Sequence, residues 1–171
     1  MEQGMGKIDD LVAMFRERRL GFALDEVMSG YHRFEPGFGP AGPLPMEFRV
    51  TWGTKDLRQY LDPKGDRFLV NDLHGRVSIE LLCCDVPCGG TLEFRYLSEH
   101  EIRYAFDFQA DSKMYHYVGE KVNIWPWNLP VSHTTCFGTL VEAETGKLVS
   151  RSVTHFRLRT LPAFLASFRL A

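Results

Sequence analysis

The sequence predicts a mainly β protein in which about eight antiparallel strands form a closed barrel or a strongly curled sheet. Three observations support this fold class. Most of the chain alternates apolar and polar residues with a period of two, as strands with one buried face do. Short segments of turn-forming residues separate these stretches, and short connections make neighbouring strands antiparallel. The 171 residues, 44% hydrophobic and 13% aromatic, suit a single domain over residues 1–171 with a substantial core.

Helices are expected before, within and after the strands. The first covers residues 7–19, KIDDLVAMFRERR, where acidic residues come early and arginines late, as the helix dipole favours. Its apolar residues recur at helical spacing: Ile8, Leu11, Val12 and Phe15. A second helix is predicted in TKDLRQYLDPKG, where Pro63 and Gly65 end it. A short C-terminal helix over 161–170 would brace the sheet with apolar residues at helical spacing: Phe164, Leu165 and Phe168.

The predicted strands carry their apolar residues on one face. In PMEFRVTW, for example, Met46 and Phe48 alternate with Glu47 and Arg49. The alternating stretches are residues 24–34, 45–52, 76–82, 91–97, 101–108, 113–118, 133–141 and 147–158. Turns are predicted at residues 72–75, 87–90, 97–100, 109–113 and 143–147, which are rich in Gly, Asp and Ser.

The segment GFGPAG, residues 37–42, matches the G-x-G-x-x-G pattern of dinucleotide-binding proteins. That pattern binds pyrophosphate only where a strand precedes it and a helix opens at it. Here the prolines Pro40 and Pro43 disfavour a helix, and the strand-like PLPMEFRV follows. We therefore interpret the segment as a loop between two antiparallel strands.

Composition and charge argue against several classes of partner. The net charge is −2 and the basic residues form no stripe, so nucleic acid is not expected as a partner. No apolar run is long enough for a membrane span and the N-terminus lacks a secretory apolar core, so we expect a cytoplasmic protein. In that compartment reduced cysteines are expected: Cys83, Cys84, Cys88 and Cys136. CCDVPC lacks the ligand spacing of a zinc site, so neither a metal nor a cofactor is expected.

The stretch GEKVNIWPWNLPVSHTT, residues 119–135, is the leading candidate for a binding segment. Long connections in compact domains are often binding loops or lids. Trp125 and Trp127 flank a proline there, which suits the closing of a barrel mouth over an apolar ligand. The alternative is that both indoles seal the core. The other candidate ligand contacts are aromatic residues of the strands: Tyr96, Tyr104, Phe106 and Tyr117.

Two histidines are candidate acid–base residues. His116 is expected to face the interior in phase with Met114 and Val118, beside Tyr104. His133 precedes two threonines at the start of a strand; the alternative is that each histidine is structural. The arginines of the strands are expected on a solvated outer face, and an interior carboxylate–arginine pair is the alternative for them: Arg49, Arg95 and Arg103.

Several ordered motifs link the chain to a known type of segment. They are Met28 with Gly30, Leu57 with Leu61 and Pro63, Gly90 with Leu92 and Phe94, Met114 with His116 and Tyr117, Thr134 with Thr135, and Leu161 with Phe164, Ser167, Phe168 and Arg169. Their order resembles an accessory β segment that accompanies the flavin domain of glucose–methanol–choline, cholesterol-oxidase-like oxidoreductases. The resemblance implies no flavin site here, because the flavin domain is absent from the similar stretch. It does imply an apolar ligand and a larger oxidoreductase as a partner. The chain departs from the pattern before Thr134, where acidic residues are usual.

These observations lead to three functional hypotheses. The first is a lipocalin-like binding or accessory domain that holds an apolar or lipid-like molecule between its strands and the tryptophan loop. The second is a cofactor-free barrel enzyme, an isomerase, cyclase or hydrolase, with His116 or His133 as its acid–base residue. The third is a structural partner that docks on a larger enzyme. An exposed edge strand could also pair two copies into a homodimer.

Overall fold

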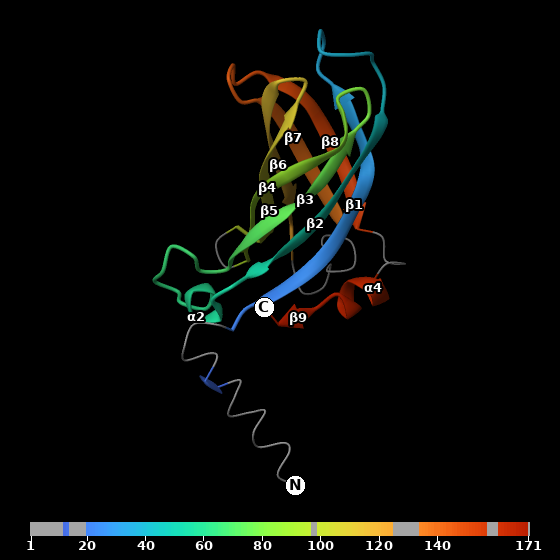
Figure 1. Cartoon of the computed structure of the whole chain (residues 1–171). Coiled ribbons are helices and arrows are strands. Elements are labelled where there is room, and N and C mark those ends of the chain that lie inside the picture. Colours follow the sequence, from blue (N-terminus) through green and yellow to red (C-terminus); the bar gives the residue numbers. More distant parts are fainter. Residues whose placement is uncertain (1–11, 14–19, 97–98, 125–133, 157–160, 171) are drawn as a thin grey trace.

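The structure is a computed structural model that describes residues 12–13, 20–96, 99–124, 134–156 and 161–170 (Figure 1). The strands are β1 (Phe22–Phe34), β2 (Leu44–Thr54), β3 (Val70–Ile79), β4 (Cys83–Arg95), β5 (Glu101–Ala110), β6 (Lys113–Lys121), β7 (Thr135–Glu142), β8 (Leu148–Phe156) and β9 (Arg169–Leu170). The helices with described bounds are α2 (Leu57–Tyr60) and α4 (Leu161–Ala166).

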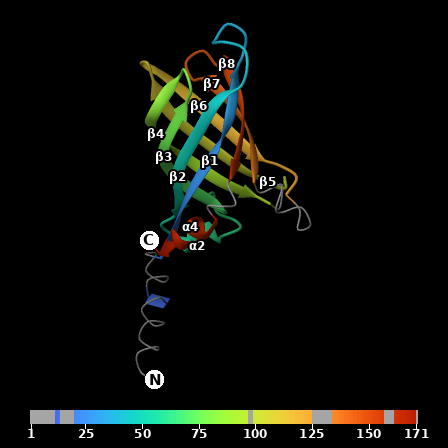
Figure 2. The same ribbon diagram turned by 90° about the vertical axis from the view of Figure 1, so that its right-hand side faces the viewer.

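The strands β1 to β8 close into an antiparallel barrel. Each strand pairs with the next one along the chain, and β1 pairs with both β2 and β8. Figures 1 and 2 show the closed wall, with α2, α4 and β9 gathered at one end. We call this the basal end, and the opposite end, with the β1–β2 loop, the apical end. The predicted fold class is confirmed, and of the two alternatives the closed barrel is the one observed.

The alternating residues lie inside the barrel as predicted. Those of β2 and β5 are at most 7% exposed: Met46, Phe48, Val50, Trp52, Ile102, Tyr104, Phe106 and Phe108. Phe48 packs against Tyr104, Phe106 and Tyr117 with ring centroids 5.7, 5.5 and 5.8 Å away. Aromatic rings therefore fill the middle of the barrel.

Two predicted turns are wrong. Residues 72–75 and 87–90 belong to β3 and β4 and pair with each other, for example Gly75 with Cys88. Glycine here allows neighbouring strands to approach closely and does not form a turn. At Gly75, for example, an added Cβ would collide with the main-chain oxygen of Arg49. The chain turns later, after β3, where Leu81 has a positive φ of 63° and a side chain that is 67% exposed.

The loop prediction for GFGPAG is confirmed. Residues 37–42 lie between the antiparallel strands β1 and β2. Gly37 and Gly42 have φ values of 91° and 112°, so these glycines supply turn conformations that other residues rarely adopt.

The helices are shorter than predicted. In α2, which has 4 residues, the Asp56 side chain caps the start by accepting from the main-chain N–H of Arg58 and Gln59. The C-terminal helix ends at Ala166, and residues 169–170 form β9 beside β1, so the prediction of a helix over 161–170 is wrong beyond Ala166. The predicted helix over 7–19 lies outside the described residues except for Val12 and Ala13, which are helical. None of the helices in the described residues could cross a membrane.

Candidate functional site

An ion pair lies inside the barrel at its basal end. Glu26 is on β1, in phase with the core residue Met28, and Lys121 is the last residue of β6. The Lys121 Nζ lies 2.9 Å from the Glu26 Oε1, and the two side chains are 5% and 6% exposed. Because β7 and β8 separate these strands in the sheet, the contact crosses the interior.

Two neutral donors also converge on the Glu26 carboxylate. The Trp52 Nε1 donates to Oε2 at 3.0 Å, and the Tyr104 hydroxyl lies 3.1 and 3.0 Å from the two carboxylate oxygens. Burial, and then the nearby Glu26 charge, raise the pKa of Tyr104 well above its ordinary value. Tyr104 is therefore a neutral donor. We call Glu26, Trp52, Tyr104 and Lys121 the basal cluster.

Lys121 has more donors than described acceptors. A lysine ammonium carries three N–H groups. Within the described residues its one hydrogen-bond acceptor is Glu26. The face of the Tyr104 ring lies 5.1 Å from Nζ and supports the positive charge through a cation–π contact. The remaining donors could meet an oxygen atom of a bound molecule.

Aromatic rings surround the basal cluster on the side of α2. We call these residues the aromatic collar: Phe22, Tyr60, Phe94 and Tyr96. Trp52 lies edge-on to Phe22 and Phe94, with centroid distances of 6.2 and 5.5 Å. Phe94 stacks on Tyr96 at 5.5 Å. Burial, and then the nearby Tyr60 and Glu26, raise the pKa of Tyr96 to about 12. Phe22, Phe94 and Tyr96 are half-buried.

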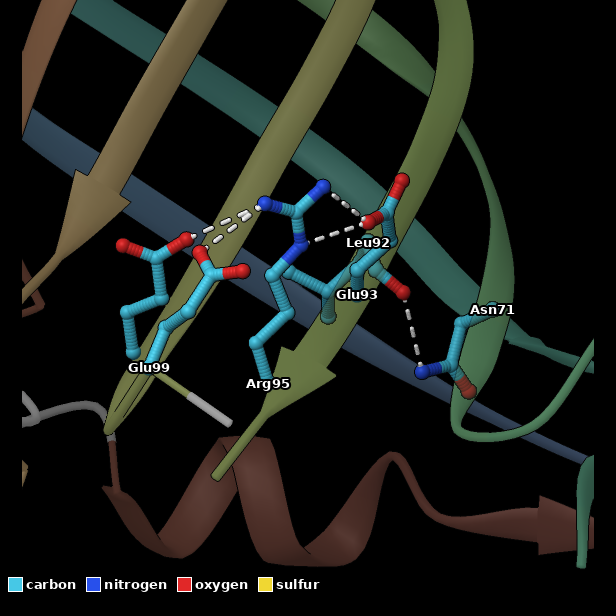
Figure 3. A network of polar contacts seen from close by, with 6 residues as sticks. Asn71, Leu92, Glu93, Arg95 and Glu99 are labelled. Atoms are coloured by element: carbon cyan, nitrogen blue, oxygen red, sulfur yellow. Dashed lines mark hydrogen bonds and ion pairs between the residues drawn. The ribbon is translucent and has the colours of Figure 1, made fainter. Parts of the chain in front are cut away.

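A network of ion pairs lies beside this collar, at the end of β4 (Figure 3). The Arg95 guanidinium lies between Glu93, at 2.7 Å, and Glu99, at 3.1 Å. Next to it the fully buried Asn71 donates from Nδ2 to the main-chain oxygen of Leu92 at 3.2 Å, while its Oδ1 has no partner among the described residues. These contacts fix the end of β4, which carries Phe94 of the collar.

A polar strip continues from the basal cluster along β6, β7 and β8. The Tyr117 hydroxyl lies 3.2 Å from the Ser152 Oγ, and Thr154 is fully buried beside them. Burial raises the pKa of Cys136 to about 12, so this thiol stays protonated at neutral pH. The strip therefore offers neutral hydroxyl and thiol groups to the interior.

Comparison with family models, with curated proteins and with solved structures found no match. The site must therefore be interpreted from its own chemistry. No set of three or more His, Cys, Asp or Glu side chains in the described residues could hold a metal ion.

Four of the predicted aromatic contacts fall in the part of the chain that the structure describes. Tyr104, Phe106 and Tyr117 are each 1% exposed in the interior, and Tyr96 is in the collar. Trp125, Trp127 and His133 lie outside the described residues.

The predicted position of His116 is wrong. Its side chain is 42% exposed on the outer surface, where Nδ1 lies 2.6 Å from the Asp107 carboxylate. The interior positions of β6 belong instead to Tyr115, Tyr117 and Lys121. The error is one of strand phase, because a shift by one residue moves a side chain to the other face.

The charged residues of the site were missed by the sequence reasoning. The arginines considered for an interior ion pair are outside the core; Arg49, for example, bonds Glu47 on the same strand at 2.7 Å and is 69% exposed. The sequence did contain a signal, because residues an even number apart in a strand point to the same face. Glu26 lies two residues from Met28, and Lys121 lies four residues from Tyr117, so both share a face with a core residue.

The described residues also line two grooves, and Glu26 of the basal cluster is among the lining residues of the second. One, of about 630 Å³, lies beside the β3–β4 turn and includes Glu47 and Leu81. The other, of about 460 Å³, lies between α4 and the β1–β2 wall and includes Arg49 and Ala163. None of the described residues predicted to bind a ligand lines either groove.

Proposed function

We propose that this chain is a lipocalin-like, small-molecule-binding barrel. An apolar, lipid-like ligand would place one oxygen atom against Lys121 and its apolar body against the aromatic collar. The observation that carries the proposal is a buried ammonium with one described acceptor. Leaving buried donors unmet is costly, and a ligand oxygen would satisfy them.

The buried ion pair itself favours a binding role over a stabilising one. Apolar residues of similar volume often stabilise a protein interior as well as a buried ion pair or better. Charged groups inside an apolar enclosure are also typical of binding sites, where a few polar groups orient an otherwise apolar ligand. The Glu26–Lys121 pair, 6% and 5% exposed, fits that pattern.

The ligand would bind at the basal end. Barrels of about eight strands have room for packed side chains or for one small ligand. Phe48, Phe106 and Tyr117 occupy the middle, so the half-buried rings of the collar are the surface on which an apolar body would lie. At about 25 cal/mol per Å² of buried apolar area, contact with these rings would supply most of the affinity.

A titration with prodan, a neutral fluorescent naphthyl ketone, tests the proposal. We expect a blue-shifted emission at one molecule per chain, and competition by long-chain ketones and alcohols. The double variant Glu26→Gln/Lys121→Met should weaken binding about tenfold, because it removes the charged donor while leaving no unpaired charge. Lys113→Met is the matched control, since Lys113 is on the same strand but 55% exposed. No blue shift, or equal affinity in all three proteins, would contradict the proposal.

The other hypotheses keep the status of predictions. A barrel enzyme that uses His116 as its acid–base residue loses support from the outward position of that side chain. The larger oxidoreductase partner follows from the resemblance alone. The predicted homodimer relied on an exposed edge strand. Because β1 pairs with both β2 and β8 and closes the barrel, two copies would have to associate through another surface.

A further inference from the structure

The number of donors on Lys121 points to a particular chemistry at its nitrogen. An ammonium has three N–H groups, whereas a protonated Schiff base at the same nitrogen has one. The described structure supplies one acceptor, the Glu26 Oε1 at 2.9 Å. The surroundings of Nζ therefore match the hydrogen-bonding needs of the protonated Schiff base better than those of the ammonium.

Glu26 is also held as a counterion would be. Its carboxylate accepts from Trp52 and Tyr104, both neutral donors, and neither of these contacts involves the Lys121 nitrogen. Charge-assisted hydrogen bonds of this kind stabilise a buried negative charge. The Tyr104 ring, 5.1 Å from Nζ, supports a cation at that nitrogen in either state.

We propose that Lys121 binds an apolar aldehyde covalently as a protonated Schiff base whose counterion is Glu26. The inference rests on the proposed function, since the apolar body of the aldehyde would occupy the same collar. Glu26 first accepts a proton from the Lys121 ammonium. The free amine then attacks the aldehyde carbon: the C–N bond forms, the C=O π bond opens, and a proton passes from the nitrogen to the oxygen to give a neutral carbinolamine. Protonated Glu26 then gives its proton to the carbinolamine hydroxyl, the C–O bond breaks as water leaves, and the nitrogen lone pair forms the C=N bond, whose positive charge faces the Glu26 carboxylate. One ammonium and one aldehyde thus give one iminium ion and one water.

The surroundings favour this product over its hydrolysis. The two charged side chains are 5% and 6% exposed, so little water reaches the bond that hydrolysis would break. The collar supplies aromatic faces for the ligand body, which suits a conjugated or aromatic aldehyde in particular. The chemical class is therefore an apolar, conjugated aldehyde.

Reductive trapping of the full chain with cinnamaldehyde and sodium cyanoborohydride tests the inference. We expect one adduct per chain in the intact mass spectrum, mapped to Lys121 by peptide analysis. Cinnamyl alcohol, which has the same body but no carbonyl carbon to attack, should protect Lys121 from labelling. Glu26→Gln should lower the rate of labelling at least about tenfold, because it removes the proton acceptor and the counterion.

Two variants keep the test independent of folding defects. Glu26→Gln/Lys121→Met keeps the hydrogen bonds from Trp52 and Tyr104 and should lose the adduct, whereas Lys113→Met should keep it. Labelling spread over exposed lysines with no preference for Lys121 would overturn the inference. If prodan binds but Lys121 is not labelled, the covalent step fails and the proposed function stands. If neither reagent binds, both fail.

Discussion

Glu26 and Lys121 are 95 residues apart in the chain and 2.9 Å apart inside the barrel. Their contact joins β1 to β6 across the interior, between strands that do not pair. Long-range contacts of this kind form only once the barrel has closed. The presence of this ion pair therefore requires both a closed barrel and an intact basal cluster.

Removing one partner of this pair should be costly. Lys121→Met leaves Glu26 buried without its cation, so we expect a loss of about 3–5 kcal/mol in the free energy of unfolding. The double variant Glu26→Gln/Lys121→Met should recover most of this loss, because a neutral amide can still accept from Trp52 and Tyr104. Urea unfolding of both variants measures the difference. Lys113→Met removes a cation that is 55% exposed and leaves the Glu142 carboxylate its hydrogen bond from the Thr145 hydroxyl, so it should lower stability less than Lys121→Met does. Equal losses for Lys121→Met and Lys113→Met would contradict a buried pair.

The Tyr117 ring lies over Gly138 and needs the space above it. A Cβ at residue 138 would overlap the Tyr117 hydroxyl and the Ser152 Oγ. We expect Gly138→Ala to lower the free energy of unfolding by about 1–3 kcal/mol, as overpacking of a core does. Gly89→Ala is the control, since the nearest atom to its added Cβ would be the Leu73 main-chain oxygen at 3.7 Å. Thermal unfolding followed by circular dichroism compares the two. A Gly138→Ala protein as stable as Gly89→Ala would mean that the ring lies elsewhere.

The barrel could be predicted where residue pattern and local geometry agree. In β2 and β5 every second side chain is buried, and period-two alternation is enough to identify both strands. In β3 and β4 the residue pattern and the geometry disagree. Gly75, Pro87 and Gly90 are residue types that are typical of turns. They are strand residues in the barrel, where glycine lets neighbouring main chains approach closely. That approach depends on the closed sheet, which a local pattern does not contain.

Two aromatic residues of the site, Tyr96 and Tyr104, could be predicted, and its charged residues could not. Tyr104 and Phe106 follow from the alternation within β5 alone. Glu26 and Lys121 also occupy interior phases, but a charged residue at such a position is usually assigned to the surface. Their partnership depends on the stagger of strands around the barrel, which sets the heights at which the two side chains meet.

His32 should make stability depend on pH near neutrality. The side chain is fully buried at the apical end, with Nε2 3.1 Å from the Glu80 main-chain oxygen. Burial lowers the pKa of His32 below its ordinary value of 6.5. The unfolded chain therefore binds a proton that the folded chain does not, so stability is full above 6.5 and falls as pH drops through the folded pKa.

Replacement of this histidine should flatten that dependence. We expect His32→Gln to reduce the fall in the free energy of unfolding between about pH 7 and pH 5, measured by urea unfolding at several pH values. His155→Gln removes an exposed histidine instead and controls for the loss of a histidine as such. If the free energy of unfolding of both variants falls with pH as steeply as that of the parent protein, a group other than His32 causes the pH dependence.

Arg169 of the C-terminal segment binds β1 through the side chain of Asp25. Its carboxylate accepts from Arg169 at 3.1 and 3.2 Å and from the Thr51 hydroxyl at 2.7 Å. The hydrogen bond from Arg169, and then the one from Thr51, lower the pKa of Asp25 below its ordinary value of 3.8. The pair stabilises the fold above that value, and this contribution is lost as pH falls through the folded pKa. Both side chains are about half exposed, so the contribution stays below about 1 kcal/mol.

Arg169→Gln should therefore raise the pKa of Asp25 toward its ordinary value while changing stability little. Carboxyl ¹³C shifts followed by NMR between about pH 2 and pH 6 measure the Asp25 pKa directly. Arg151→Gln is the matched control, because it breaks an exposed pair with Glu35 and touches no partner of Asp25. An Asp25 pKa that is the same in Arg169→Gln and in the parent protein would show that Arg169 does not bind the Asp25 carboxylate in solution.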